Sequence, residues 1–132
     1  EAASAVADPA WPTSLAGLDL DLGLRRAMGM KPLYLSMLGR YRDGRRDTPA
    51  QVRQALDAGD LKTAELLSHS LRGVSAQIGA TRVPADAQAL EQAIRDGHPR
   101  AGLELLLAEL ESSLGELVRA LDAGLPPEPE RP

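Results

Sequence analysis

A regular series of leucines near the carboxyl end constrains the fold more than any other feature of this chain. The leucines recur at intervals of 4, 3, 4, 3 and 4 residues, as Leu103, Leu107, Leu110, Leu114, Leu117 and Leu121. At about 100° per residue, this spacing forms one apolar stripe on an α-helix, the pattern of a helix in an antiparallel bundle. The composition agrees, because 23 leucines with no phenylalanine and two tyrosines suit an aliphatic helical core. A sheet would use more β-branched and aromatic residues.

Helical periodicity and helix-ending signals divide the chain into six expected helices. Their ranges are 20–28, 32–42, 49–58, 61–78, 83–96 and 99–123. Thr48 and Asp60 are the expected N-caps of the third and fourth helices, and Gly79 is the expected stop of the fourth. We therefore expect an all-α protein, an antiparallel four-helix bundle with short additional N-terminal helices. The helices suffice to close a bundle within one chain, so we expect a monomer.

The two ends of the chain differ in composition from the middle. Residues 1–17 are rich in Ala, Ser and Pro without a helical period, and residues 126–132 read Pro-Pro-Glu-Pro-Glu-Arg-Pro. Such segments are typical of a linker and a disordered or extended tail. The bundle domain is expected to occupy residues 18–125.

Charge and composition exclude several classes of function. Fifteen basic and nineteen acidic residues give a net charge of −4, which indicates no general attraction to nucleic acid or anionic membranes. No apolar run is long enough to cross a bilayer, and the amino terminus lacks the order of a signal peptide. The chain has no cysteine and hence no disulfide framework. We expect a soluble protein.

His69 and Gly73 are expected on the outward face of the fourth helix. The apolar positions of that helix form a stripe roughly 80° wide: Ala64, Leu67, Leu71, Val74 and Ile78. His69 lies about 180° from the centre of this stripe, and Gly73 follows it by one turn. A glycine inside a helix costs about 1 kcal/mol relative to alanine. This sequence therefore accepts a penalty where it clears space beside an imidazole.

The residues around His69 resemble the signature of histidine phosphotransfer (HPt) domains, the shuttle modules of multistep phosphorelays. Three motifs carry the resemblance across residues 18–123: His69-x-x-Arg72-Gly73 with Gly79 after it, Ala87-x-x-Leu90-Glu91, and the opening Leu20-Asp21-Leu22-Gly23-Leu24-Arg25-Arg26. Arg72 stands where the family usually has lysine. A guanidinium differs from an ammonium in shape and hydration, so equal rates are not expected.

The resemblance implies roles for individual residues. Nε2 of His69 would attack phosphorus, and a polar residue 22 positions later, here Glu91, would hydrogen-bond Nδ1. Gln88, one turn before Glu91, is a second polar candidate for that bond. Arg72 would offset charge on the phosphoryl oxygens, whereas His98 lies in a turn and is expected only to be solvated.

The resemblance also implies a partner. A receiver domain would supply an aspartyl phosphate and its bound Mg²⁺, and a second receiver aspartate would take the phosphoryl group from His69. The chain itself lacks a phosphate-binding loop and a carboxylate cluster for Mg²⁺. We expect it to bind no ATP, metal or other cofactor and to have no kinase activity.

Four residues near His69 form a candidate docking surface for the receiver. Lys62, Leu66, Gly73 and Ala76 fall within about 50° of His69 on the expected helix. Leu66 would then be an exposed apolar residue that the bundle does not need for its own packing, which indicates a partner. Lys62 and Arg72 would add charge complementarity at the rim.

Two other functions remain open. A helical docking or dimerisation domain without covalent chemistry would explain the bundle, with His69 incidental. The dimerisation and phosphoacceptor part of a histidine kinase would need a two-helix hairpin that pairs across a dimer. The HPt interpretation is preferred, with the chain as the carboxyl-terminal module of a hybrid sensor kinase or as a free-standing shuttle. Either form is expected in the cytoplasm, the first at the cytoplasmic end of a membrane-bound kinase.

Overall fold

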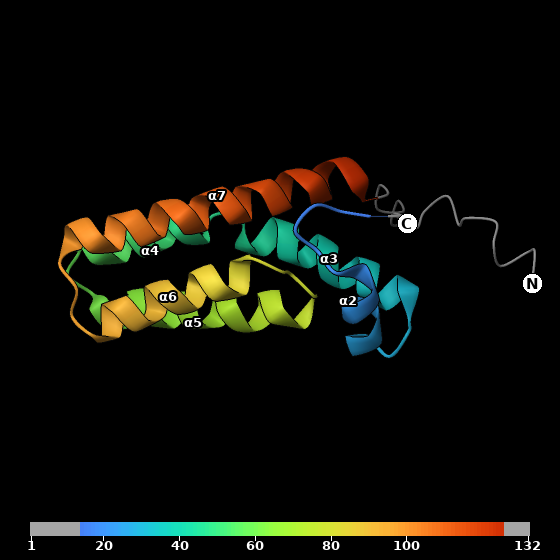
Figure 1. Ribbon diagram of the computed structural model, residues 1–132, viewed down its shortest axis with the longest axis horizontal. Coiled ribbons are helices and arrows are strands. Elements are labelled where there is room, and N and C mark those ends of the chain that lie inside the picture. Colours follow the sequence, from blue (N-terminus) through green and yellow to red (C-terminus); the bar gives the residue numbers. More distant parts are fainter. Residues whose placement is uncertain (1–13, 126–132) are drawn as a thin grey trace, which may run out of the picture.

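The computed structural model describes residues 14–125, which fold into helices without a β-strand (Figure 1). The helices are α2 (Leu20–Arg26), α3 (Lys31–Arg45), α4 (Thr48–Asp57), α5 (Leu61–Gln77), α6 (Val83–Arg95) and α7 (Arg100–Gly124). Every expected helix is present, and each end lies within three residues of its expected position. The all-α prediction is confirmed.

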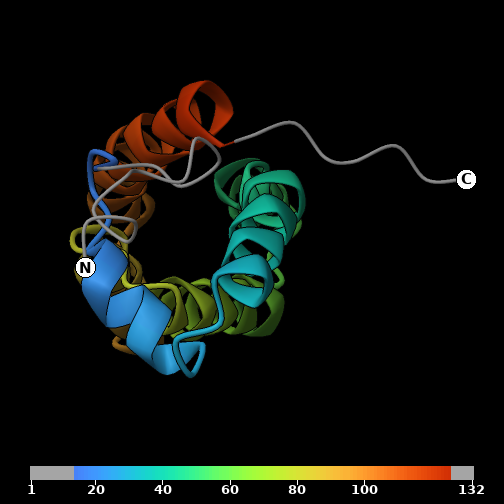
Figure 2. The same cartoon turned by 90° about the vertical axis from the view of Figure 1, so that its right-hand side faces the viewer.

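The helices form a four-column bundle. α3 and α4 follow one another along one column beside α7, and α5 and α6 form the adjacent pair (Figure 1). The view along the bundle shows the columns around a common axis, with α2 across one end (Figure 2). α5 packs mainly against α6 and α4, and α7 packs against α6. The connections between successive columns are short, so neighbours run antiparallel.

The leucine stripe of α7 forms much of the core, as predicted. All six leucines of the stripe are buried, as are Val83, Ala87, Leu90 and Ile94 on α6. Two tyrosines complete the interior at the α3 end. Tyr34 donates a hydrogen bond to the carbonyl oxygen of Ile78 at 2.6 Å, and the hydroxyl groups of Tyr41 and Ser75 lie 2.7 Å apart. Both buried phenols therefore have hydrogen-bond partners, as buried polar groups require.

The buried face of α5 differs from the expected stripe. Leu67 and Val74 are only half-buried, whereas Ser68 and Ser75 are fully buried. Serine can be buried here because its hydroxyl is satisfied: that of Ser68 donates to the carbonyl oxygen of Ala64 at 2.9 Å. At 100° per residue, the helix is rotated about 40° from the expected orientation. This rotation turns the outward face of α5 partly toward α6.

The predicted ends of α5 are confirmed, and the predicted start of α4 is wrong. Asp60 caps α5 by accepting from the backbone N–H of Thr63 at 3.1 Å, and Gly79 ends it with φ +88°. Hydrogen bonds from Thr63 also lower the pKa of Asp60. Thr48 is the first residue of α4 rather than its cap, because the break after α3 is only two residues long and the Thr48 side chain turns inward, where it is buried.

Two glycines allow α2 to rest directly on the end of α5. The backbone N–H of Asp19 donates to the carbonyl oxygen of Gly79 at 2.8 Å. A Cβ atom at Gly79 would lie 2.5 Å from the carbonyl oxygen of Asp19, and one at Gly23 would collide with the Tyr34 hydroxyl and the Ile78 carbonyl. Only glycine fits at either position, so α2 and α5 meet backbone to backbone.

The expected linker and tail lie mostly outside the described residues, which exclude 1–13 and 126–132. Residues 14–17, the last part of the expected linker, contact the bundle. Leu15 packs partly buried against the core, and the carbonyl oxygen of Gly17 accepts from the N–H of Thr81 at 2.9 Å. Among the helices of residues 14–125, none combines the length and apolar character that a membrane span requires.

Candidate functional site

His69 presents its ring on an open part of α5. Its side chain is 56% exposed. Gly73, one turn later, is also exposed, and apart from its own chain neighbours and the local helix backbone no described atom lies within 4 Å of where its Cβ would stand. The two residues are placed as the sequence predicted, and a reactant can approach the imidazole from solvent.

Glu91 on α6 holds one nitrogen of the ring. Its carboxylate is 4% exposed, and Oε2 lies 2.9 Å from Nδ1 of His69. An ionised carboxylate only accepts hydrogen bonds, so we assign the ring proton to Nδ1. Nε2 of the neutral ring then carries a free lone pair. The bond depends on the rotation of α5 described above, which brings His69 toward α6.

Arg72 lies on the Glu91 side of the ring. Nη1 of Arg72 lies 3.6 Å from Oε1 of Glu91, and Nη2 lies 3.4 Å from Nδ1 of His69. A guanidinium only donates, so the second contact would need the opposite tautomer from the Glu91 bond. The contact of Nδ1 with the charged Glu91 carboxylate, at 2.9 Å, is shorter and stronger than its contact with Arg72, so we keep the proton on Nδ1 and infer that Arg72 acts on the ring mainly through its ion pair with Glu91.

A second arginine completes the cluster, and the sequence reasoning missed it. Nη2 of Arg95 donates to Oε2 of Glu91 at 2.8 Å, and Nε of Arg95 donates to Oε2 of Glu65 on α5 at 2.8 Å. The spacing of Glu91 and Arg95 at i and i+4 could have indicated their pairing. Glu65 precedes His69 by four residues on α5, so the two lie on the same face of that helix. This spacing could have indicated that Glu65 lies near the site. Oε2 of the buried Glu91 carboxylate is thus paired, whereas Oε1 has no hydrogen-bond partner among the described residues and only the Arg72 guanidinium at 3.6 Å.

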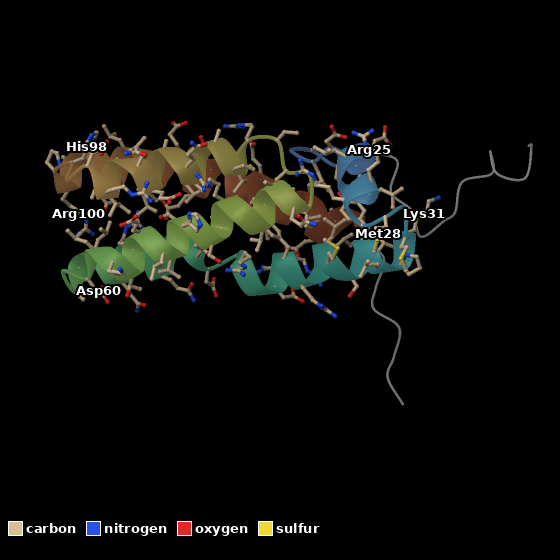
Figure 3. All side chains as sticks on the ribbon, turned by 90° about the horizontal axis from the view of Figure 1, so that it is seen from below. Arg25, Met28, Lys31, Asp60, His98 and Arg100 are labelled. Atoms are coloured by element: carbon tan, nitrogen blue, oxygen red, sulfur yellow. The ribbon has the colours of Figure 1, made fainter. Side chains whose placement is uncertain are left out.

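Gln88, the other candidate for orienting the ring, is exposed. In the described part of the chain it makes no hydrogen bond to His69, whose Nδ1 is occupied by Glu91. His98 is exposed in the turn between α6 and α7, at the end of the bundle where Asp60 begins α5 (Figure 3). No group of three or more potential metal ligands occurs within residues 14–125. The geometry thus brings Glu91 to the ring and leaves Gln88 in solvent.

The candidate docking residues lie around His69 with different exposures. Lys62 and Gly73 are exposed, and Leu66 is 56% exposed. Ala76 is half-buried, and the guanidinium of Arg26 from α2 donates to its carbonyl oxygen. The surface is therefore bordered by α2, and its largest apolar side chain, Leu66, faces solvent.

Comparisons with known proteins agree with this architecture. The family model described as the Hpt domain matches residues 36–124, well over half of the chain. Histidine-containing phosphotransfer protein B from Pseudomonas aeruginosa is 21% identical, with a TM-score of 0.73 over 83% of this chain and 95% of that one. The HPT domain of a sensor hybrid histidine kinase from Shewanella is 27% identical, with a TM-score of 0.69 over 83% and 94%.

Comparison with curated protein sequences gives no significant match. The family match begins inside α3 and ends with α7, so it spans all four columns of the bundle and includes His69 and Glu91. Hpt domains relay phosphoryl groups to and from receiver domains, which implies a histidine phosphotransfer role in a phosphorelay. With its helical bundle and its matched segment, the chain belongs to the Hpt domain family.

Proposed function

We propose that this domain is a phosphocarrier in which Nε2 of His69 accepts a phosphoryl group from a receiver aspartyl phosphate and passes it to another receiver aspartate. One observation supports this proposal above the others: the 2.9 Å contact between Nδ1 and Glu91 assigns the proton of the neutral ring to Nδ1, so that Nε2 of this exposed ring carries the lone pair. An imidazole with its lone pair in solvent is a nucleophile near neutral pH.

The transfer balances without any group from this chain beyond His69. The Nε2 lone pair forms a bond to phosphorus while the bond between phosphorus and the aspartate oxygen breaks, and the aspartate leaves as a carboxylate. Nδ1 keeps its proton throughout, and the positive charge that develops on the ring is offset by Glu91. In the second transfer, a carboxylate oxygen of another receiver attacks phosphorus while the bond from phosphorus to Nε2 breaks. Mg²⁺ held by the receiver would neutralise the phosphoryl oxygens, and Arg72 would add a positive charge beside the ring.

The receiver would dock on the α5 face formed by Lys62, Leu66, Gly73 and Ala76. The exposed leucine and the bare backbone at Gly73 offer a small apolar area beside the ring. A carrier must meet several partners briefly, which suits a small and weak interface. This chain would provide the histidine and its orientation, and it would have no kinase activity or ATP site of its own.

Incubation with a phosphorylated receiver tests the proposal. Wild-type protein should acquire an acid-labile, base-stable label, and His69→Gln should acquire none. The matched control is His98→Gln, which should label normally. Both variants should melt near the wild-type temperature, because both rings are exposed. A label that persists in His69→Gln would contradict the proposal, and a folded domain that binds receivers without ever being labelled would favour the docking-only alternative.

The cellular setting is also proposed. One structural neighbour is described as the HPT domain of a hybrid histidine kinase, and a similar role as a cytoplasmic module of such a kinase fits this chain. The isolated domain should be a monomer because one chain closes the bundle. Sedimentation should give a mass near 14.0 kDa, and a mass of twice that value would contradict the expectation.

A further inference from the structure

Arg95 shares an acceptor with the imidazole of His69. Nη2 of Arg95 and Nδ1 of His69 lie 2.8 and 2.9 Å from the same oxygen, Oε2 of Glu91. Nε of Arg95 is held by Glu65 on the neighbouring helix at 2.8 Å. Arg95 is thus fixed at two points, one on its own helix and one on α5. The bonds to Glu65 and Glu91 raise the pKa of Arg95, so its guanidinium stays charged.

The charge of Glu91 presents a difficulty for a nucleophilic histidine. A nearly buried carboxylate beside an imidazole favours the protonated ring. A protonated imidazole has no lone pair and cannot attack phosphorus. Glu91 must therefore orient the ring without protonating it, and nearby cations can achieve this by offsetting the carboxylate. Arg95 contacts Glu91 at 2.8 Å, whereas Arg72 approaches at 3.6 Å, so Arg95 contributes the larger part.

Charged groups on the other helices are directed elsewhere. From α3, the guanidinium of Arg45 donates to the hydroxyl of Ser70 at 3.2 Å. Ser70 follows His69 in the sequence, but this bond does not involve Glu91. The ion pairs of α4, formed by Arg53 and Asp57, run to α7. α7 also packs on α6, but among residues 14–125 it sends no ion pair to Glu91. The cations that contact Glu91 in this part of the chain are therefore Arg72, Arg95 and, when protonated, His69.

We propose that Arg95 is a positioning residue that acts through Glu91, holding its carboxylate on Nδ1 of His69 and offsetting the negative charge beside the ring. The expected effect on the rate of phosphoryl acceptance rests on the proposed function. Arg95 touches no reacting atom. Its effect should appear in the pH dependence of the reaction rather than as a uniform loss, because what it controls is the fraction of unprotonated ring.

The experiment compares Arg95→Ala and Arg95→Lys with the control Arg82→Ala. Arg82 is a good match because it directly precedes α6, is 54% exposed against 52% for Arg95, and forms one surface ion pair with Glu116 at 2.9 Å. The rate of phosphoryl acceptance from one receiver is measured from acid to alkaline pH. The ring signals of His69 are titrated by NMR on the same proteins, with His98 as an internal reference.

We expect Arg95→Ala to shift the acid side of the rate profile and the His69 NMR titration to higher pH. Acceptance should fall about three- to tenfold at mildly acidic pH and recover in alkaline solution. Arg95→Lys should restore most of the rate, and Arg82→Ala should match wild type. If Arg95→Ala does not fold, Arg95→Gln, which keeps a polar side chain without the charge, replaces it, and the same outcomes are expected.

Two results would overturn the inference: an unchanged pH profile, or an equal loss at every pH, which would indicate a purely structural role. The NMR titration needs no phosphoryl donor. A shifted titration in a domain that never accepts phosphoryl would therefore overturn the proposed function and leave the inference standing. Normal acceptance by wild type, together with an unshifted titration in Arg95→Ala, would overturn the inference about Arg95 and leave the proposed function standing.

Discussion

Replacing Gly73 by leucine should separate the stability of the domain from its function. Gly73 is exposed in the middle of α5, and no side chain or other segment among the described residues, its two chain neighbours aside, lies within 4 Å of where a Cβ would stand. Leucine is a far better helix former, by about 0.8 kcal/mol. We therefore expect Gly73→Leu to be more stable than wild type and to melt about 3–6 °C higher, given the usual shift per kcal/mol for a domain of this size.

The same side chain should obstruct the receiver. Leucine would fill the space beside the His69 ring and hold the partner surface away by roughly 3 Å, while in-line transfer needs the reacting atoms within about 3.5 Å. A displacement of 1 Å can already cost about 100-fold in rate. Transfer from a phosphorylated receiver should therefore fall by about 100-fold or more.

Gly44→Leu provides the matched control. Gly44 is also an exposed helical glycine with open space at Cβ, but it lies near the end of α3. This variant should gain similar stability and transfer at the wild-type rate. Phosphoramidate, a small phosphoryl donor, should still label Gly73→Leu, because docking is not required. Rapid-quench labelling and thermal unfolding give the two readouts. Equal transfer by both leucine variants would refute the docking surface, and a lowered melting temperature for Gly73→Leu would refute the open site.

Three further predictions concern docking, ring orientation and alkaline stability. Leu66→Asp should weaken receiver binding, measured by calorimetry, without lowering stability; unfolding would contradict the assignment of its surface. Glu91→Ala and Arg72→Ala should each slow acceptance by about 1–2 kcal/mol in the barrier, or roughly 5- to 30-fold, with Arg72→Lys mild. Wild-type rates in both alanine variants would contradict these roles. Burial raises the pKa of Tyr34 and of Tyr41 to about 12. Their contribution to stability should be complete below about pH 10, the usual value in an unfolded chain, and lost as pH rises toward the folded-state pKa. Urea unfolding at about pH 9 and pH 11 checks this, and Tyr34→Phe should reduce the loss.

The helices could be predicted from local sequence because their signals are local. The leucine stripe of α7 and the cap formed by Asp60 depend on residues within a few positions of each other, and both are confirmed. The buried face of α5 was less predictable. Ser68 and Ser75 are polar residues that enter the core because Ala64 and Tyr41 satisfy their hydroxyls, and Tyr41 is distant in sequence.

At the site, too, features set by local spacing could be predicted, and features set by packing between helices could not. The outward placement of His69 and Gly73 came from helical spacing, and Glu91 as a partner came from the resemblance to HPt domains. The distance between the imidazole and this carboxylate depends on the packing of α5 against α6, which spacing alone does not define. Arg95 was missed because its importance arises from the burial of Glu91, and a sequence does not show how deeply a carboxylate at the edge of an apolar stripe is buried.

The contact between Gly23 and Gly79 makes the attachment of α2 an all-or-none event. Side chains between two helices can loosen gradually, but backbone atoms in direct contact have no flexible layer between them. α2 should therefore leave the bundle as one unit and expose the end of α5 when it does. Amide hydrogen exchange would show this as a single shared opening rate for the N–H groups of Asp19 and Thr81, which bond across this contact.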